Sequence, residues 1–217
     1  MAVYAPPPDT GLAVVFADDT LVVVAKPAGL LSVPGRGADK QDCLLHRAQA
    51  KFADALAVHR LDMSTSGLLL LARGPAMHSA LSRLFRERRV GKRYVAEVEG
   101  RLAVDTGEID LPLICDWPNR PRQKVDFAIG KHSLTRFRTI WRDPSGLSSR
   151  VELEPVTGRS HQLRVHLAAL GHPIIGDELY GSGSLDNGER LSLHATDLRF
   201  DHPISGQALH FHHDAPF

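Results

Sequence analysis

Residues 58–73 read Val-His-Arg-Leu-Asp-Met-Ser-Thr-Ser-Gly-Leu-Leu-Leu-Leu-Ala-Arg. A single carboxylate, that of Asp62, lies between Arg60 and a hydroxyl and glycine cluster at positions 64–67, just before an apolar run. Four leucines and an alanine without polar alternation predict a strand covered on both faces. A loop that feeds such a strand is held rigidly, and catalytic groups are usually mounted on rigid loops. Alternatively, Asp62 only caps a turn.

The composition is typical of a globular protein. A chain of 217 residues, 43% hydrophobic and 24% charged, can bury a core of its own. No apolar segment approaches membrane-spanning length and the first residues lack the pattern of a signal peptide, so we expect a cytoplasmic protein. Cys43 and Cys115 lie far apart, which favours neither a disulfide framework nor a thiolate metal site.

Basic residues gather in two stretches although the net charge is only +1, from 26 basic and 25 acidic residues. The first stretch, opposed only by Glu87, comprises Arg83, Arg86, Arg88, Arg89, Lys92 and Arg93. The second comprises Arg120, Arg122 and Lys124. Such clusters in a nearly neutral chain indicate contact with a polyanion. Alternatively, the first is a solvated helix end whose cations suit the helix dipole.

The remaining pattern is rich in strands and poor in helices. Residues 12–16 and 21–25 predict a β-hairpin, and further strands are expected from position 92 and over residues 133–141, 150–156, 191–200 and 208–211. Helices are expected over residues 41–56 and from Pro75 to about position 88. Residues 110–124, which contain three prolines, predict a long irregular loop.

One further helix is short. Ser160 is a candidate N-cap, Gly171 a candidate C′ residue, and the leucines between them predict an amphipathic helix. Residues 174–180 lead into a loop with Gly181, Gly183 and Gly188. With a proline-rich tail over residues 1–10, these elements predict one domain over residues 11–217, of mixed α/β or α+β class.

The sequence lacks the motifs of metal-dependent, nucleotide-hydrolysing and serine esterase chemistry. His161 and His166 are five positions apart, so they would point roughly 140° away from each other on a helix, unlike a zinc-binding pair. His210, His212 and His213 lie close to the C-terminus. We therefore expect no metal site. There is no phosphate-binding glycine loop and no Gly-x-Ser-x-Gly elbow.

A carboxylate with candidate arginine partners remains. An aspartate used as nucleophile or base must stay ionised, and a nearby guanidinium achieves this by lowering its pKa. Arg60 and Arg164 are the candidate partners of Asp62. Alternatively, Arg164 is an exposed helical arginine.

Four motifs together resemble the RluA family of pseudouridine synthases. Residues 59–67 are similar to the family's signature, in which the aspartate is catalytic. Lys-Pro-Ala-Gly-Leu at 26–30, Lys-Arg-Tyr-Val-Ala at 92–96 and Gly-Arg-Ser-His-Gln-Leu-Arg-Val-His at 158–166 resemble its other motifs, in family order. Two departures are visible: Ser64 stands where many relatives carry an acidic residue, and Arg73 where many have lysine.

This resemblance implies a fold and a reaction. The fold is α+β, with a bisected mixed, mainly antiparallel β-sheet flanked by helices and loops, and without an S4 domain. The reaction is the isomerisation of uridine to pseudouridine without a cofactor. Asp62 would act as the nucleophile or the general base. Tyr94 would stack on the uracil ring and assist loss of its C5 proton, and Arg164 would pair with Asp62. Arg60 would hold the site open.

The resemblance also gives the basic clusters a partner. It implies RNA contacts for His59, Arg60, Leu163, Arg83, Arg86, Arg89, Lys92, Arg93, Arg120, Arg122 and Lys124. Trp117 either stacks on a splayed base or is a buried loop anchor. The target uridine must leave its stack to react, which costs least in a loop.

Residues 32–36 and 113–121 are similar to the family member that modifies both the tRNA anticodon stem-loop and 23S rRNA. We therefore expect both RNAs as partners of a monomer that has no obligate protein partner. The alternative is a non-catalytic RNA-binding protein, such as an RNA chaperone, on the same scaffold.

Overall fold

The computed structural model describes residues 4–182 and 190–217. The chain folds as two compact units: the first unit contains Met1–Lys92 and His194–Pro216, and the second contains Arg93–Leu193 with Phe217. The predicted loop residues Gly183 and Gly188 lie outside the described residues. In the described part of the chain, no helix has the length and apolar character needed to cross a membrane.

The first unit is built around β4 (Ser66–Arg73), the strand predicted from the leucine run. Residues Leu68 to Ala72 are completely buried, as expected for a strand covered on both faces. The other elements of this unit are β1 (Val14–Ala17), β2 (Leu21–Lys26), the 3-10 helix η1 (Ala38–Lys40), α1 (Leu44–Gln49), β3 (Ala55–Ala57), α2 (Gly74–Arg86), β11 (Leu193–Asp201, whose first residue belongs to the second unit) and β12 (Ala208–His212).

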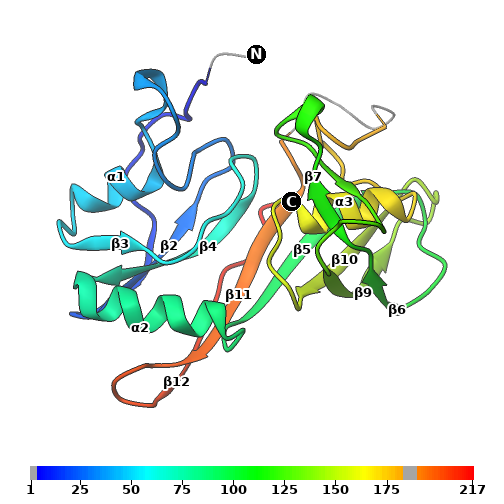
Figure 1. The fold of residues 1–217 in the computed structure, drawn as a ribbon. Coiled ribbons are helices and arrows are strands. Elements are labelled where there is room, and N and C mark those ends of the chain that lie inside the picture. The colour runs from blue at the N-terminus through cyan, green and yellow to red at the C-terminus, as the bar shows by residue number, and fades with distance from the viewer. Residues whose placement is uncertain (1–3, 183–189) are drawn as a thin grey trace. The chain divides into compact units, whose positions relative to one another are not determined.

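Strand pairing in the first unit is mixed. β1 and β2 form the predicted antiparallel hairpin, and β2 and β3 both pair antiparallel with β4. β11 runs parallel to β4 and pairs antiparallel with β12. Figure 1 shows β4 in cyan beside β2, with α2 running below them.

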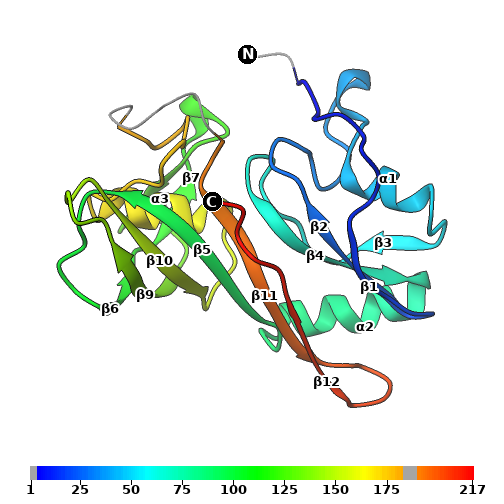
Figure 2. The same ribbon diagram turned by 180° about the vertical axis from the view of Figure 1, so that it is seen from behind.

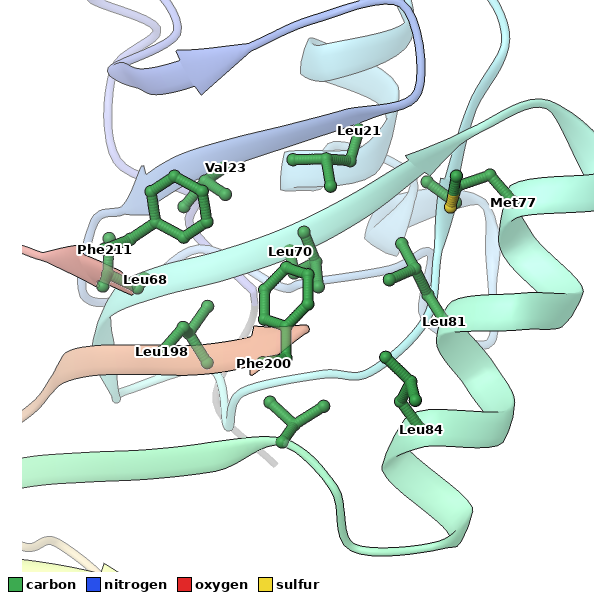
Figure 3. Close-up of a cluster of buried hydrophobic side chains, with 12 residues drawn as sticks. Leu21, Val23, Leu68, Leu70, Met77, Leu81, Leu84, Leu198, Phe200 and Phe211 are labelled. Atoms are coloured by element: carbon green, nitrogen blue, oxygen red, sulfur yellow. The ribbon is translucent and has the colours of Figure 1, made fainter. Parts of the chain in front are cut away.

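One hydrophobic cluster joins the sheet of the first unit to α2. Met77, Leu81 and Leu84 recur at the spacing of one helical face and are buried. They pack with residues of β2, β4, β11 and β12, among them Leu70 and Phe200 (Figure 3). This core fixes β4 and therefore the loop that precedes it.

The second unit is an antiparallel sheet with a short helix. Its elements are β5 (Gly91–Glu99, whose first two residues belong to the first unit), β6 (Thr106–Asp110), β7 (Leu113–Cys115), the 3-10 helix η2 (Trp117–Asn119), β8 (Gln123–Val125), β9 (Leu134–Arg142), β10 (Ser148–Pro155) and α3 (Gln162–Ala169). The pairing order is β5–β10–β9–β6, while β7 and β8 form a separate hairpin (Figure 2).

Two predicted segments differ from the structure in their extent. The helix predicted over residues 41–56 is only α1, because residues 55–57 pair with β4 as β3 instead. The irregular loop predicted over residues 110–124 contains the β7–β8 hairpin. Its prolines do not interrupt pairing, because Pro112, Pro118 and Pro121 all lie outside the two strands.

The predicted amphipathic helix is present, but its start and its burial differ from the prediction. α3 begins at Gln162, its N-cap residue is His161, and no side chain caps it, so the prediction of Ser160 as N-cap was wrong. Gly171 follows the C-cap residue Leu170 with a positive φ of 82°, as predicted. Residues 162–167 are all buried, and Leu170 is exposed. The helix is thus embedded rather than lying with one face in solvent.

The predicted fold class is confirmed. Helices are few and most strand pairs are antiparallel, with β4 and β11 as a parallel pair.

Candidate active site

The residues on both sides of Asp62 are held by hydrogen bonds from the end of β2 and the segment after it. The hydroxyl of Ser32 donates to the carbonyl of Leu61 (2.8 Å) and accepts from the Leu61 amide (3.0 Å). The Met63 carbonyl accepts from the Gly29 amide and from the Lys26 ammonium, both at 2.9 Å. Asp62 itself is half-buried. Its backbone is therefore fixed while its side chain keeps some access to solvent.

Lys26 is buried at 1% exposure and was missed as a site residue by the sequence interpretation. Besides Met63, its ammonium donates to the carbonyls of Pro27 (2.9 Å) and Leu30 (2.6 Å). Burial lowers the pKa of Lys26 to about 7, and the Asp62 carboxylate opposes this lowering. A buried lysine is thus close enough to Asp62 for the two charges to interact.

The strand after Asp62 approaches its parallel neighbour closely at Gly67. A Cβ atom at this position would lie 2.3 Å from the Ala195 carbonyl oxygen and 2.5 Å from the Ala195 nitrogen. The φ angle of Gly67, 111°, also lies in the region that favours glycine. Glycine is therefore required where the loop carrying Asp62 enters the sheet.

A hydrogen-bonded chain also connects this point to the C-terminal segment. The Ser66 hydroxyl lies 2.8 Å from Nδ1 of the buried His194, and Nε2 of His194 lies 3.0 Å from Nδ1 of His213. His194 and His213 come from beyond position 190, so their proximity to Ser66 could not be seen in the local sequence.

His59 and Arg60 differ in their surroundings. The ring of His59 stacks on Phe85 with centroids 4.4 Å apart, and its Nε2 accepts a hydrogen bond from the Leu70 amide (2.9 Å). Burial lowers the pKa of His59 to about 3, with Lys92 adding to the effect. These contacts give neutral His59 a structural role. Arg60 is exposed.

In the second unit, Arg164 forms a buried bidentate ion pair with Asp177. Its Nε and Nη2 atoms donate to the two carboxylate oxygens at 2.7 and 2.6 Å, and both side chains are almost fully buried. The backbone amides of Leu179 and Tyr180 donate to the same carboxylate. The alternative of an exposed helical arginine was therefore wrong.

Asp177 and Tyr180 were missed by the sequence interpretation. The Arg164 guanidinium carbon lies 5.2 Å from the centroid of the Tyr180 ring, whose hydroxyl is 2.8 Å from Nδ1 of His161. An aspartate beside a glycine is also typical of an ordinary turn, so the sequence carried no signal for this ion pair.

The remaining predicted residues of the second unit are divided between core and surface. Tyr94 is half-buried on β5 opposite Leu153 and packs against the second core cluster, which includes Leu163. Arg93 lies 3.3 Å from the carboxylate of Glu152.

The basic residues of the two clusters are mostly exposed. Arg83, Arg86 and Arg89 are exposed at the end of α2 and just after it, while Lys92 is half-buried. Arg120, Arg122 and Lys124 are exposed around the β7–β8 hairpin. Trp117 is 65% exposed and lies under the Arg120 guanidinium at 4.5 Å, so its interpretation as a buried anchor was wrong.

Comparison with known proteins identifies the class. The model of the family described as RNA pseudouridylate synthase matches residues 20–169. The chain belongs to this family and is an RNA uridine-to-pseudouridine isomerase, which excludes the alternative of a non-catalytic RNA-binding protein.

Two curated relatives make the resemblance more specific. The dual-specificity RNA pseudouridine synthase RluA of Yersinia pestis is 51% identical over 205 residues, covering 94% of this chain and 99% of the relative. The protein of the same name from Haemophilus influenzae is 47% identical, covering 99% and 98%. Among solved structures, human RNA Pseudouridylate Synthase Domain Containing 1 aligns with a TM-score of 0.81 and 32% identity, covering 98% of this chain and 87% of that one.

Proposed function

We propose that this synthase modifies two RNAs, the anticodon loop of tRNAs and 23S rRNA. Near-full-length identity to bacterial proteins named dual-specificity RNA pseudouridine synthases carries this proposal. The resemblance of residues 32–36 and 113–121 to the dual-specificity member of the family supports it further. In both RNAs the target uridine flips out of its stack before the reaction.

In this proposal Asp62 is the catalytic carboxylate. Hydrogen bonds from Ser32, Gly29 and Lys26 to its two chain neighbours support a fixed position, which lowers the cost of orienting the group toward the flipped nucleotide. Asp62 acts either as a nucleophile on the sugar or as a base. The bond between uracil N1 and ribose then breaks, the uracil turns, and a new carbon–carbon bond joins its C5 atom to the ribose.

Tyr94 and Arg164 complete the proposed site. Tyr94 stacks on the base and assists the loss of the C5 proton, while the guanidinium of Arg164 pairs with Asp62 and keeps it ionised. The two hydrogen bonds that Arg164 donates to the Asp177 carboxylate support a fixed orientation for that guanidinium. Asp62 belongs to the first unit and the other two residues to the second, so the proposal requires both units to act together as one catalytic domain.

RNA contacts in this proposal come from the basic residues. Arg60 helps to hold the site open once the uridine has left its stack. The exposed Arg83, Arg86, Arg89, Arg120, Arg122 and Lys124 contact the RNA together with Lys92 and Arg93, while His59 and the buried Leu163 border the RNA path from the protein side. Phosphate contacts of this kind supply affinity rather than sequence choice.

The targets are tested by mapping pseudouridine in tRNA and 23S rRNA from cells that lack the protein. We expect pseudouridine to disappear from one anticodon-loop position and one 23S position, and to return when the gene is restored. Loss from only one of the two RNAs would refute dual specificity while leaving the synthase activity intact.

We further propose that the enzyme works as a monomer in the cytoplasm and needs no cofactor. Sedimentation of the purified protein at the concentrations used for activity tests the first point. A mass twice that of the 23.8 kDa chain would contradict it.

A further inference from the structure

The N-terminal arm, residues 4–9, is anchored to the first unit although it forms neither helix nor strand. The sequence predicts only a proline-rich tail here. In Figure 2 the arm is the dark blue chain that runs past α1 towards β1. Pro6, Pro7 and Pro8 already have a fixed φ, so ordering this segment loses little backbone freedom. A few contacts can therefore hold an arm of this composition in place.

The hydroxyl of Tyr4 makes two hydrogen bonds to the body of the unit. It donates to the carbonyl of Asp42 at 2.9 Å and accepts from the backbone amide of Leu31 at 3.0 Å. Tyr4 is half-buried, and burial raises the pKa of its hydroxyl, so this group keeps its proton at neutral pH. One side chain thus joins the arm to two separate segments of the unit.

Arg47 of α1 holds the prolines of the arm. Its guanidinium donates to the carbonyls of Pro7 at 2.7 Å and Pro8 at 3.4 Å, and it forms a bidentate pair with the Asp42 carboxylate at 2.8 and 2.7 Å. The Arg47 side chain is only 11% exposed. A Cβ atom built on Gly29 would lie 3.7 Å from Cδ of Pro7, which is an ordinary van der Waals contact. The Pro7 ring therefore lies against Gly29.

The arm docks on the segment that fixes the loop carrying Asp62. Within this segment, Gly29 and Ser32 bond the two chain neighbours of Asp62. The arm packs against Gly29 itself, and the amide that donates to Tyr4 is that of Leu31, directly before Ser32. The path from the arm to the loop is therefore short, and it consists of backbone groups and the Ser32 hydroxyl.

We propose that Tyr4 is a positioning residue for Asp62. It acts through Leu31 and Ser32 and keeps the loop in the orientation that the reaction requires. The inference rests on the proposed function of Asp62. A small displacement of a catalytic group slows the chemical step, whereas substrate affinity depends on contacts made elsewhere. The effect of Tyr4 therefore falls on the rate of pseudouridine formation rather than on RNA binding.

The test measures pseudouridine formation in single turnovers, with the full-length enzyme in excess over a target stem-loop RNA, and the dissociation constant of the same RNA. Tyr4→Phe keeps the ring and removes the hydroxyl. We expect its rate constant to fall about tenfold and its dissociation constant to stay within about twofold of the wild type. Asp9→Asn is the matched control, because Asp9 is an exposed carboxylate of the arm that lies 3.8 Å from Arg47. Its rate should equal that of the wild type.

A double-mutant cycle with Ser32→Ala tests the route of the effect. If Tyr4 acts through Ser32, the variant with both substitutions should react at the rate of Ser32→Ala alone, within about twofold. Thermal denaturation of each variant sets the assay temperature well below the lowest midpoint. A loss of rate at that temperature then reports positioning and not unfolding.

Two results would overturn the inference: a wild-type rate for Tyr4→Phe, or losses in the cycle that multiply independently. Weaker RNA binding by Tyr4→Phe at an unchanged rate would also overturn it, because the arm would then be an RNA contact. Asp62→Asn is assayed in parallel. Wild-type activity of Asp62→Asn would refute the proposed function, whereas an inactive Asp62→Asn beside a fully active Tyr4→Phe would refute the positioning role alone.

Discussion

At the scale of single residues, the loop carrying Asp62 is defined by groups that the opening motif does not contain. Ser32, Gly29 and Lys26 bond the neighbours of Asp62. Sequence could single out Asp62 as a candidate, because a carboxylate ahead of a buried strand is a local pattern. It could not predict these bonds, because they join residues more than 25 positions apart and depend on how β2 pairs with β4.

Lys26 predicts a pH dependence of stability. Its pKa is about 7 in the folded protein against an ordinary value of 10.5, so between these pH values the unfolded chain binds more protons than the folded one. Stability from this group therefore rises with pH. Relative to Lys26→Met, the wild-type free energy of unfolding should increase by about 2 kcal/mol from pH 7 to pH 9. Urea denaturation of both proteins at pH 7 and pH 9 measures these free energies. The prediction would be contradicted if the difference between the two proteins were the same at both pH values.

The buried ion pair of Arg164 predicts separate effects on stability and activity. Arg164→Met leaves the Asp177 carboxylate buried without its guanidinium, which should cost roughly 3–5 kcal/mol of stability. Adding Asp177→Asn removes that charge and should restore most of the stability, but not pseudouridine formation. Thermal denaturation and product formation are measured on the single and double variants. Full activity in the double variant would show that Arg164 is not required.

At the scale of elements, the strength of local patterns decided which predictions succeeded. β4 and α2 were predicted correctly, because the leucine run and Pro75 with its apolar face are strong signals. α3 was predicted as a helix, but its burial was not, because its polar residues have distant partners: Gln162 and His166 both bond Thr135. A polar residue that is satisfied by tertiary contacts resembles a solvent-facing residue in the sequence.

The close approach of β4 to β11 predicts a specific sensitivity at Gly67. Gly67→Ala places a Cβ against the backbone of Ala195 and should lower the free energy of unfolding by roughly 3 kcal/mol. Gly74→Ala, at the other end of β4, is the matched control. Gly74 has a φ of 74° but open space around its Cβ position, so only about 1–2 kcal/mol should be lost. Equal losses in the two variants, measured by denaturation, would argue against the clash.

The β7–β8 hairpin predicts a stacking contact with RNA. Trp117→Ala should weaken binding of a target stem-loop by roughly 1–3 kcal/mol, with little change in its salt dependence. Trp141→Ala is the control, because Trp141 is 50% exposed on β9, away from this hairpin. Equal affinities of the wild type and Trp117→Ala, measured by fluorescence anisotropy, would remove Trp117 from the RNA contacts.

At the scale of the whole molecule, family membership followed from four motifs, whereas the division into two units did not. Asp62 lies in one unit, and Tyr94 and Arg164 lie in the other. The boundaries fall at Lys92 and Leu193, where neither proline nor glycine clusters interrupt the pattern, so no linker could be seen. The sequence favoured one domain for the same reason, since it contains neither an internal repeat nor a low-complexity linker.

The central claim is that Asp62 carries the chemistry, and Asp62→Asn tests it most directly. This substitution removes the charge but keeps the shape, so the hydrogen bonds of the neighbouring residues should persist. In a reaction with a target stem-loop RNA, we expect binding within about twofold of the wild type and no pseudouridine. Asp19→Asn, at an exposed position of the β1–β2 turn, should behave as the wild type. Pseudouridine formed by Asp62→Asn at the wild-type rate would contradict the account.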